Sequence, residues 1–263
     1  MKEKKTVRVN DEKNDDFAAL DIKAETVGAD YRYVRRGPLW LAAEFVLYRI
    51  IATPLVFLMA KLLFGLKIKN RRSVGKLKKT GYFLYGNHTQ NMMDAYTPSL
   101  VSFPKRAHIV TGPEAVSIKG IRTVVAMLGA IPLPSVTKGY APFRKALGFR
   151  VNERRAVTIY PEAHIWPWYT GVREFSDASF DYPAELLVPC VAFATTFRRR
   201  KIFKNLHPYL TVTLSDPIVP DASLPRAERR RDLRDRVYAF MKETVSSPDN
   251  YAFVNYEKDG SRD

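Results

Sequence analysis

The segment from Gly86 to Asp94, Gly-Asn-His-Thr-Gln-Asn-Met-Met-Asp, contains the residue types that acid–base chemistry requires. It follows Tyr82–Tyr85, a short aromatic and apolar run that predicts a buried strand. Asn87 and His88 therefore lie where this strand ends, and α/β folds bind their ligands at that end. An Asp bonded to one ring nitrogen of a histidine fixes the tautomer and stabilises the imidazolium. His88 and Asp94 are thus predicted to be a general base and its orienting partner, with a purely structural histidine as the alternative.

A second pattern of strand and turn supports the catalytic interpretation. Ala156–Tyr160 has the composition of another short strand and is followed directly by Pro161 and Glu162. Together the two patterns resemble the 1-acylglycerol-3-phosphate O-acyltransferase family. The hallmarks of that family are Asn-His-x4-Asp after one strand and Pro-Glu-Gly-Thr-Arg after another. The resemblance extends roughly from residue 67 to residue 220 and includes a Val-Pro pair after a third apolar run, here Val188-Pro189.

Three departures from the family pattern concern spacing and phosphate recognition. Five residues separate His88 from Asp94, and Met93 occupies the usual acidic position. We expect the turn before a helix to absorb the additional residue, so Asp94 remains the expected partner of His88. Pro134 and Ile165 stand where such enzymes carry arginines that contact the substrate phosphate. For a phosphorylated acceptor other cations must take over, and the candidates are Arg173, which we favour, Lys138 and Arg144.

The resemblance implies transfer of a fatty acyl group from acyl-CoA or acyl-acyl carrier protein to the hydroxyl of 1-acylglycerol-3-phosphate. His88 would take the proton from that hydroxyl, and neither a covalent acyl-enzyme nor a cofactor is required. Glu162 would bind acceptor hydroxyls or position its loop, and Asn87 would cap the turn or contact the substrate. One alternative is a different lysolipid acceptor. Another is a catalytically silent lipid-binding or membrane-shaping protein on the same fold.

Length, composition and charge restrict the other classes of function. The chain of 263 residues suits one large domain, with or without a membrane appendage. Four dispersed histidines and the single Cys190 provide no metal-ligand spacing, and the sequence has no Gly-rich phosphate loop. The net charge of +16 predicts a polyanionic partner. Because the cations flank apolar segments and no nucleic-acid-binding motif occurs, we expect an anionic membrane surface and not nucleic acid.

The N-terminal part of the chain divides into an arm and an apolar segment. Residues 1–36 are charged and lack sustained periodicity, which predicts a flexible arm. Residues 37–66 are long and apolar enough to associate with a membrane, but charged residues and Pro54 interrupt them. A kinked helix or helix hairpin in one leaflet is therefore favoured over a straight span, with burial against the domain as the alternative. Seven cations within residues 67–79 would be attracted to anionic headgroups of the cell membrane. The single Cys190 allows no disulfide within the chain, which suits the cytoplasmic face.

Residues 67–263 are predicted to form the acyltransferase domain. Leu186–Phe197 and Tyr209–Leu214 have the composition of further strands. A helix with one apolar stripe is expected from about Pro225 to Val245. Strands separated by helical stretches indicate an α/β domain in which helices flank a mixed central sheet.

Overall fold

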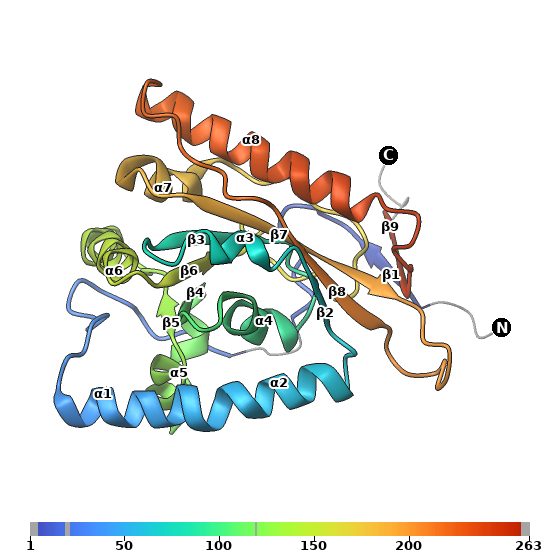
Figure 1. Cartoon of the computed structure of the whole chain (residues 1–263), viewed down its shortest axis with the longest axis horizontal. Helices are drawn as coiled ribbons and strands as arrows, with labels where there is room; N and C mark the ends of the chain where they lie inside the picture. Colours follow the sequence, from blue (N-terminus) through green and yellow to red (C-terminus); the bar gives the residue numbers. More distant parts are fainter. Residues whose placement is uncertain (1–4, 19–21, 119, 259–263) are drawn as a thin grey trace.

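The structure is a computed structural model that describes residues 5–18, 22–118 and 120–258 (Figure 1). Its main sheet contains β2 (Lys67–Lys69), β3 (Tyr82–Gly86), β4 (Ala107–Thr111), β5 (Ala130–Pro132), β6 (Ala156–Ile159), β7 (Cys190–Arg198) and β8 (Tyr209–Leu214). The spatial order is β2-β8-β7-β3-β6-β4-β5. All neighbours run parallel except β7 and β8, which are antiparallel. The expected mixed sheet is confirmed.

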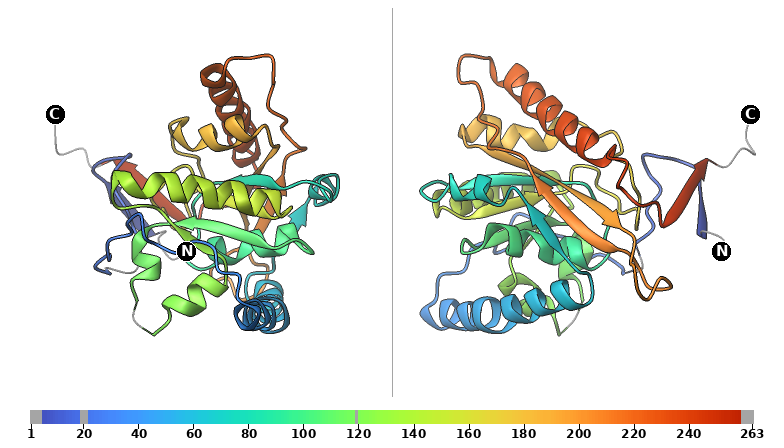
Figure 2. Two further views of the ribbon diagram at one scale, coloured as in Figure 1. Left: turned by 90° about the vertical axis from the view of Figure 1, so that its left-hand side faces the viewer. Right: turned by 45° about the vertical axis from the view of Figure 1, so that its right-hand side comes forward.

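Helices cover both faces of this sheet (Figures 1 and 2). One apolar core lies between the sheet and two helices, α4 (Met93–Ser102) and α2 (Thr53–Leu62). The other lies between the sheet and three helices, α6 (Tyr140–Asn152), α7 (Asp181–Leu186) and α8 (Arg226–Val245). The shorter helices are α3 (Arg72–Gly75), α5 (Arg122–Met127) and the 3-10 turns Pro113–Val116, Thr137–Gly139 and Ala178–Phe180. The layered α/β architecture expected from the sequence is therefore present.

Burial explains why the strands were recognisable in the sequence. All five residues of β3 and all four of β6 are buried, as expected for central strands covered on both faces. The strand expected at Tyr209–Leu214 is confirmed, and so is the terminal helix. β7 begins at Cys190, later than expected, because α7 ends at Leu186 and Leu187 adopts a left-handed conformation with φ of 51°. An apolar run preceding a strand can therefore belong to the end of a helix.

The described parts of the expected flexible arm pack against the domain. β1 (Lys5–Val9) pairs in parallel with β9 (Val254–Lys258) to form a separate two-stranded sheet. Phe17 contacts the rings of Trp166 and Tyr256 at centroid distances of 5.7 and 5.8 Å. The sequence predicted a flexible arm, whereas these parts of it are packed. The packing comes from aromatic residues scattered through a charged segment. Residues 1–4 and 19–21 of the expected arm lie outside the described residues.

The apolar N-terminal segment forms one continuous helix in place of a hairpin. It consists of α1 (Pro38–Phe45), the π-helical turns η1 (Val46–Ala52) and α2, and it follows the lower edge of the molecule in Figure 1. Pro54 falls near the start of α2, directly after the wider π turns. By length and composition this helix could cross a membrane, and most of it is exposed. One candidate membrane-associated helix is thus present.

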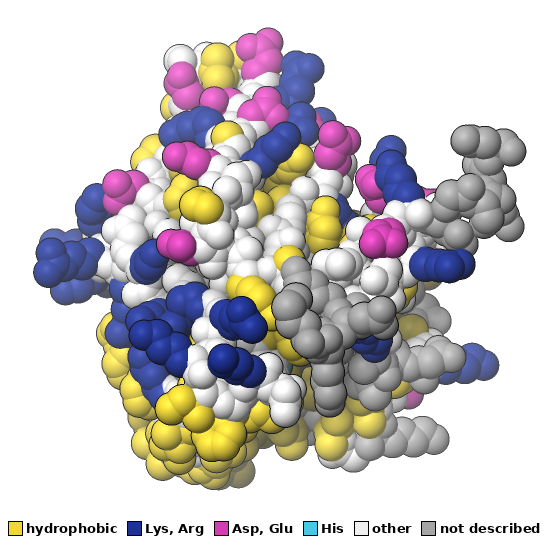
Figure 3. All heavy atoms as spheres, turned by 90° about the vertical axis from the view of Figure 1, so that its right-hand side faces the viewer, with side chains coloured by type: hydrophobic (Ala, Val, Ile, Leu, Met, Phe, Trp, Pro, Cys, Tyr) yellow, Lys and Arg dark blue, Asp and Glu magenta, His cyan; other side chains and the backbone are white. Residues whose placement is uncertain are grey.

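The two faces of this helix differ in chemistry. The inner face packs on the domain through Tyr48, Val56 and Ala60, and Glu44 pairs with Arg106 at 2.9 Å. The outer face exposes large apolar side chains: Leu39, Leu41, Phe45, Val46, Ile50, Ile51, Leu55, Phe57, Leu58 and Leu62. Figure 3 shows an apolar underside with Lys and Arg side chains gathered directly above it. An exposed apolar stripe beneath a cationic rim is typical of a helix that lies in a membrane interface.

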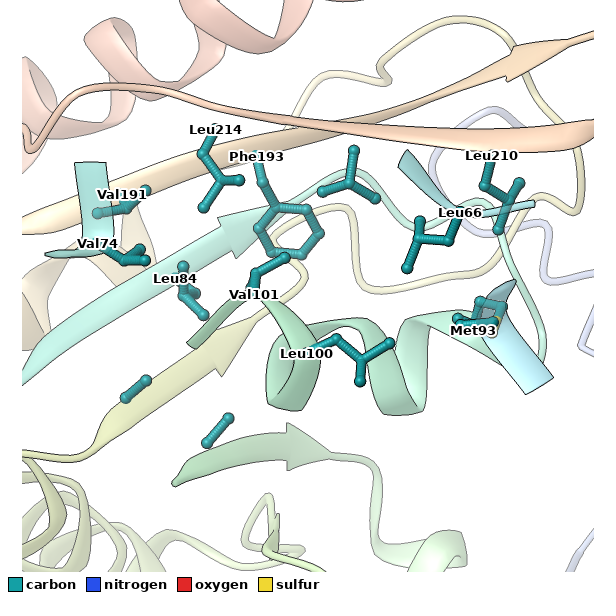
Figure 4. Packing of buried hydrophobic residues seen from close by; sticks show 14 of the residues in the cluster. Leu66, Val74, Leu84, Met93, Leu100, Val101, Val191, Phe193, Leu210 and Leu214 are labelled. Atoms are coloured by element: carbon teal, nitrogen blue, oxygen red, sulfur yellow. The ribbon is translucent and has the colours of Figure 1, made fainter. Parts of the chain in front are cut away.

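The packing of α4 explains the unusual motif spacing. Met93 is fully buried and points into the core between α4 and the sheet, near Leu66 and Leu210 (Figure 4). The next residue, Asp94, faces the end of β3 and is bonded to His88. The position that is usually acidic in the resembling family is therefore a core position in this chain.

Met93→Asp is consequently expected to destabilise the fold and not to restore a motif. A carboxylate at this position would be buried without a cation, and such substitutions belong to the most destabilising class, roughly 3–5 kcal/mol. Urea unfolding of the variant and of the isosteric control Met93→Leu measures the difference. A variant as stable as the wild type would show that Met93 is not part of the core.

Candidate active site

His88 and Asp94 form a direct pair at the carboxyl end of β3. The Nδ1 atom of His88 lies 2.9 Å from Oδ2 of Asp94. The His88 side chain is 22% exposed, whereas that of Asp94 is 2% exposed. The imidazole is thus held from inside through Nδ1, which leaves Nε2 as the nitrogen that can exchange a proton.

The loop between the two residues fixes the carboxylate in place. The backbone amides of Thr89 and Gln90 both donate to Oδ2 of Asp94 at 2.8 Å. Asp94 lies in the first turn of α4, where a negative charge is favourable. Burial raises the pKa of Asp94, while the hydrogen bonds from His88 and the two amides oppose that effect. The loop closes over one additional residue, and the expected pairing is present.

Tyr160, which the sequence did not single out, completes the environment of His88. Its ring stacks on the imidazole with a centroid distance of 4.5 Å and an interplanar angle of 18°. Its hydroxyl donates to the backbone carbonyl of Asp94 at 2.6 Å. Tyr160 therefore holds both the ring and the start of α4. The available signal was its position as the last residue before Pro161 in the second motif.

The register of β3 and β6 brings the two motifs to one edge of the sheet. Tyr85 pairs with Ile159, and His88 and Glu162 each lie three residues beyond these partners. The motif loops are also joined through their backbones. The amide of Trp166 donates to the carbonyl of His88 at 3.1 Å, and that of Trp168 donates to Thr89 at 2.9 Å. These bonds align the second loop beside His88.

The turn after Glu162 keeps a backbone shape that favours glycine. Ala163 has a φ of 63°, in the left-handed region, where the resembling family carries Gly. An alanine adopts this conformation at a cost of about 1–2 kcal/mol. The surrounding contacts therefore hold the loop shape although the glycine is missing.

Glu162 and Arg173 form a buried ion pair behind this loop. The Nε atom of Arg173 lies 3.2 Å from Oε2 of Glu162, and the two side chains are 5% and 0% exposed. Arg173 also donates to the carbonyls of Glu162 and His164 and stacks on Trp166 at 4.8 Å. Of the two roles expected for Glu162, the geometry supports positioning of the loop. Arg173, expected to read a phosphate, is instead engaged by this loop and is nearly inaccessible.

Because the pKa of the Glu162 carboxyl is raised, the stability of the protein is expected to depend on pH. Burial raises its pKa from 4.5 to about 7, although Arg173 and His88 lower it. Between these values the folded state retains a proton that the unfolded state has released. The free energy of unfolding should therefore fall by up to about 3 kcal/mol as pH rises from about 4.5 to about 7.

Urea unfolding across this pH range provides the measurement, with Glu162→Gln as the comparison. The variant should lose most of the slope, because its amide does not titrate. Asp94, whose pKa is also raised, contributes a slope of the same sign to both proteins. An unchanged slope in the variant would contradict the assignment to Glu162.

The remaining candidate residues lie in different environments. Asn87 is fully buried, and its amide exchanges hydrogen bonds of 2.7 and 3.1 Å with the backbone of Thr195 on β7. It joins the end of β3 to the middle of β7, which differs from the expected substrate contact. Arg144 is paired with Asp181 at 2.8 Å and with Glu185, so its charge is already compensated.

Lys138 is the remaining cation of the expected set. It is exposed in the 3-10 turn that follows β5, at the same edge of the sheet as the two motifs, and has no ion-pair partner among the described residues. Within residues 5–18, 22–118 and 120–258, no group of three or more His, Cys, Asp or Glu side chains could hold a metal ion.

The fold is similar to that of a solved enzyme. A crystal structure of the 1-acyl-sn-glycerophosphate (LPA) acyltransferase PlsC from Thermotoga maritima matches with a TM-score of 0.52 and 13% sequence identity. The match covers 80% of this chain and 95% of that chain. No family model and no curated protein matches the sequence. At this identity the likeness concerns the architecture, and the chain has the layered α/β fold of that acyltransferase.

Proposed function

We propose that this protein is a membrane-associated O-acyltransferase. The observation that carries the proposal is the 2.9 Å contact between His88 and Asp94 at a strand end, with the imidazole partly exposed. This arrangement suits a general base whose second nitrogen faces a substrate. The similar fold of the Thermotoga maritima enzyme supports the same class of reaction.

The proposed reaction needs no covalent intermediate on the protein. His88 Nε2 accepts the proton of an acceptor hydroxyl as its oxygen attacks the thioester carbonyl carbon. The tetrahedral intermediate collapses, the carbon–sulfur bond breaks, and the imidazolium returns the proton to the leaving thiolate. Asp94 stabilises the imidazolium during these steps. Cys190 is fully buried on β7, and burial raises its thiol pKa well above the ordinary value, which suits a core residue.

The proposed donor is acyl-CoA or acyl-acyl carrier protein, and the proposed acceptor is 1-acylglycerol-3-phosphate. The exposed apolar helix would place the enzyme at the cytoplasmic face of the cell membrane, where a lysolipid acceptor resides. With Arg173 and Arg144 engaged by other residues, Lys138 becomes the leading candidate for contact with the acceptor phosphate. An acceptor carrying a different headgroup is the alternative within the same proposal.

The test is acyl transfer by the purified full chain. Labelled acyl-CoA and acyl-acyl carrier protein are each supplied with 1-acylglycerol-3-phosphate, other lysophospholipids and monoacylglycerol. Transfer to 1-acylglycerol-3-phosphate in preference to the others is expected. Faster transfer to the neutral lipid would overturn the phosphate assignment. Vesicle binding without transfer to any acceptor would favour the catalytically silent lipid-binding protein.

A further inference from the structure

A cavity lies far from His88, between the N-terminal helix and the domain. Its volume is about 490 Å³, and it is lined by α1 and η1 on one side. The opposite wall comes from Lys78, which precedes β3, and from the residues that directly precede β4 and β6. His88 and Glu162 follow the carboxyl ends of β3 and β6, so the cavity lies at the other end of these parallel strands. The four residues of β6 alone separate the two ends by roughly 13 Å.

The lining of this cavity is strongly cationic. Two acidic residues, Glu44 and Glu153, face six basic ones: Arg49, Lys78, Lys105, Arg106, Arg154 and Arg155. Both acids are already paired. Glu44 binds Arg106 at 2.9 Å, and Glu153 binds Arg155 at 3.1 Å and also Arg150, from outside the lining, at 3.2 Å. The cavity therefore has an excess of positive charge that its own acids do not neutralise.

Three of the lining cations, Lys78, Lys105 and Arg154, have no acidic partner among the described residues and come from the segments before β3, β4 and β6. Lys78 and Arg154 are exposed, and neither side chain has a hydrogen-bond or ion-pair partner among the described residues. Lys105 lies beside them and donates to the carbonyls of Thr80 and Arg154 at 2.7 and 2.6 Å. The pKa of Lys105 is lowered, first by burial and then by repulsion from Arg154. A bound anion would relieve that repulsion.

The rim of the cavity is apolar on the side of the helix. Leu41 and Phe45 line it and belong to the exposed apolar face of α1. A ligand that fits both surfaces needs a negative headgroup and a hydrocarbon part. A membrane phospholipid has both parts. Its phosphate would lie among the cations, and its chains would lie along the helix.

We propose that this cavity binds the headgroup of an anionic phospholipid of the surrounding membrane. The site is separate from the acceptor site at His88 and does not depend on the proposed reaction. The bound lipid would join α1, through its chains, to the segments before β3, β4 and β6, through its phosphate. It would thereby hold the domain at a set orientation over the bilayer, with the carboxyl edge of the sheet available to substrates.

The test compares two double variants that remove the same amount of charge. Lys78→Gln with Arg154→Gln alters the cavity. Lys145→Gln with Arg231→Gln alters exposed cations on α6 and α8, which cover the opposite face of the sheet. Binding of the full chain is measured to soluble dihexanoyl phosphatidylglycerol, to dihexanoyl phosphatidylcholine and to inorganic phosphate.

Phosphatidylglycerol is expected to bind roughly tenfold or more weakly to the cavity variant, because two of the cations that would meet its phosphate are removed. The control variant should change less than about twofold, and phosphatidylcholine should bind both variants equally. If the two variants lose the same affinity for phosphatidylglycerol, the binding is due to non-specific surface charge and the proposal is wrong. Inorganic phosphate binding as tightly as the lipid would overturn the assignment to a lipid. Circular dichroism of both variants establishes that each is folded.

Discussion

His88→Ala is expected to reduce acyl transfer by at least about a hundredfold, the usual lower range for loss of a general base. The side chain is partly exposed and its loop is held by backbone bonds to Trp166 and Trp168, so the variant should remain folded. The measurement is the rate of transfer from labelled acyl donor, with circular dichroism as the check on folding. Full activity in folded His88→Ala protein would eliminate the proposed mechanism.

Asp94→Asn tests the same mechanism and is expected to lose less activity than His88→Ala. Three donors, from His88, Thr89 and Gln90, meet one carboxylate oxygen, and an amide oxygen at that position can accept all three. The substitution should therefore remove the charge that stabilises the imidazolium while retaining the ring orientation. We expect a smaller loss than in His88→Ala. A loss of equal size would indicate that the asparagine amide has rotated and that the histidine tautomer has changed.

Above pH 7, where Glu162 is ionised, Arg173→Ala is expected to destabilise the protein by roughly 3–5 kcal/mol, because it leaves the buried Glu162 carboxylate without its cation. The carbonyls of Glu162 and His164 would also lose their donor. Urea unfolding measures the loss, and Arg173→Lys should recover part of it. If the variant is as stable as the wild type, the ion pair is not a structural element of the loop.

The same variant distinguishes loop positioning from recognition of the acceptor. At a temperature where Arg173→Ala stays folded, transfer to 1-acylglycerol-3-phosphate and to a neutral monoacylglycerol should fall together. Lys138→Gln should instead raise KM for the phosphorylated acceptor alone, by roughly tenfold for one charge-assisted contact. A rise in KM limited to the phosphorylated acceptor in Arg173→Ala would restore the phosphate role first expected for that residue.

Local sequence determined the parts of this protein that depend on short-range patterns. The buried strand before His88, the strand before Glu162 and the terminal helix were all recognisable, because burial on both faces or along one stripe imposes a composition. The pairing of His88 with Asp94 was also expected, because six residues suffice for a loop to close between a strand and a helix.

Contacts between distant segments required the tertiary structure. Tyr160 acquired its role from the register of β3 with β6, Arg173 from its ion pair with Glu162, and the N-terminal arm from the pairing of β1 with β9. Arg173 looked like a free cation in the sequence, but burial beside Glu162 makes it part of the loop. The sequence by itself thus determined which residues could do chemistry, and the fold decided which of them are accessible and which are paired, because accessibility and pairing depend on neighbours far away in the chain.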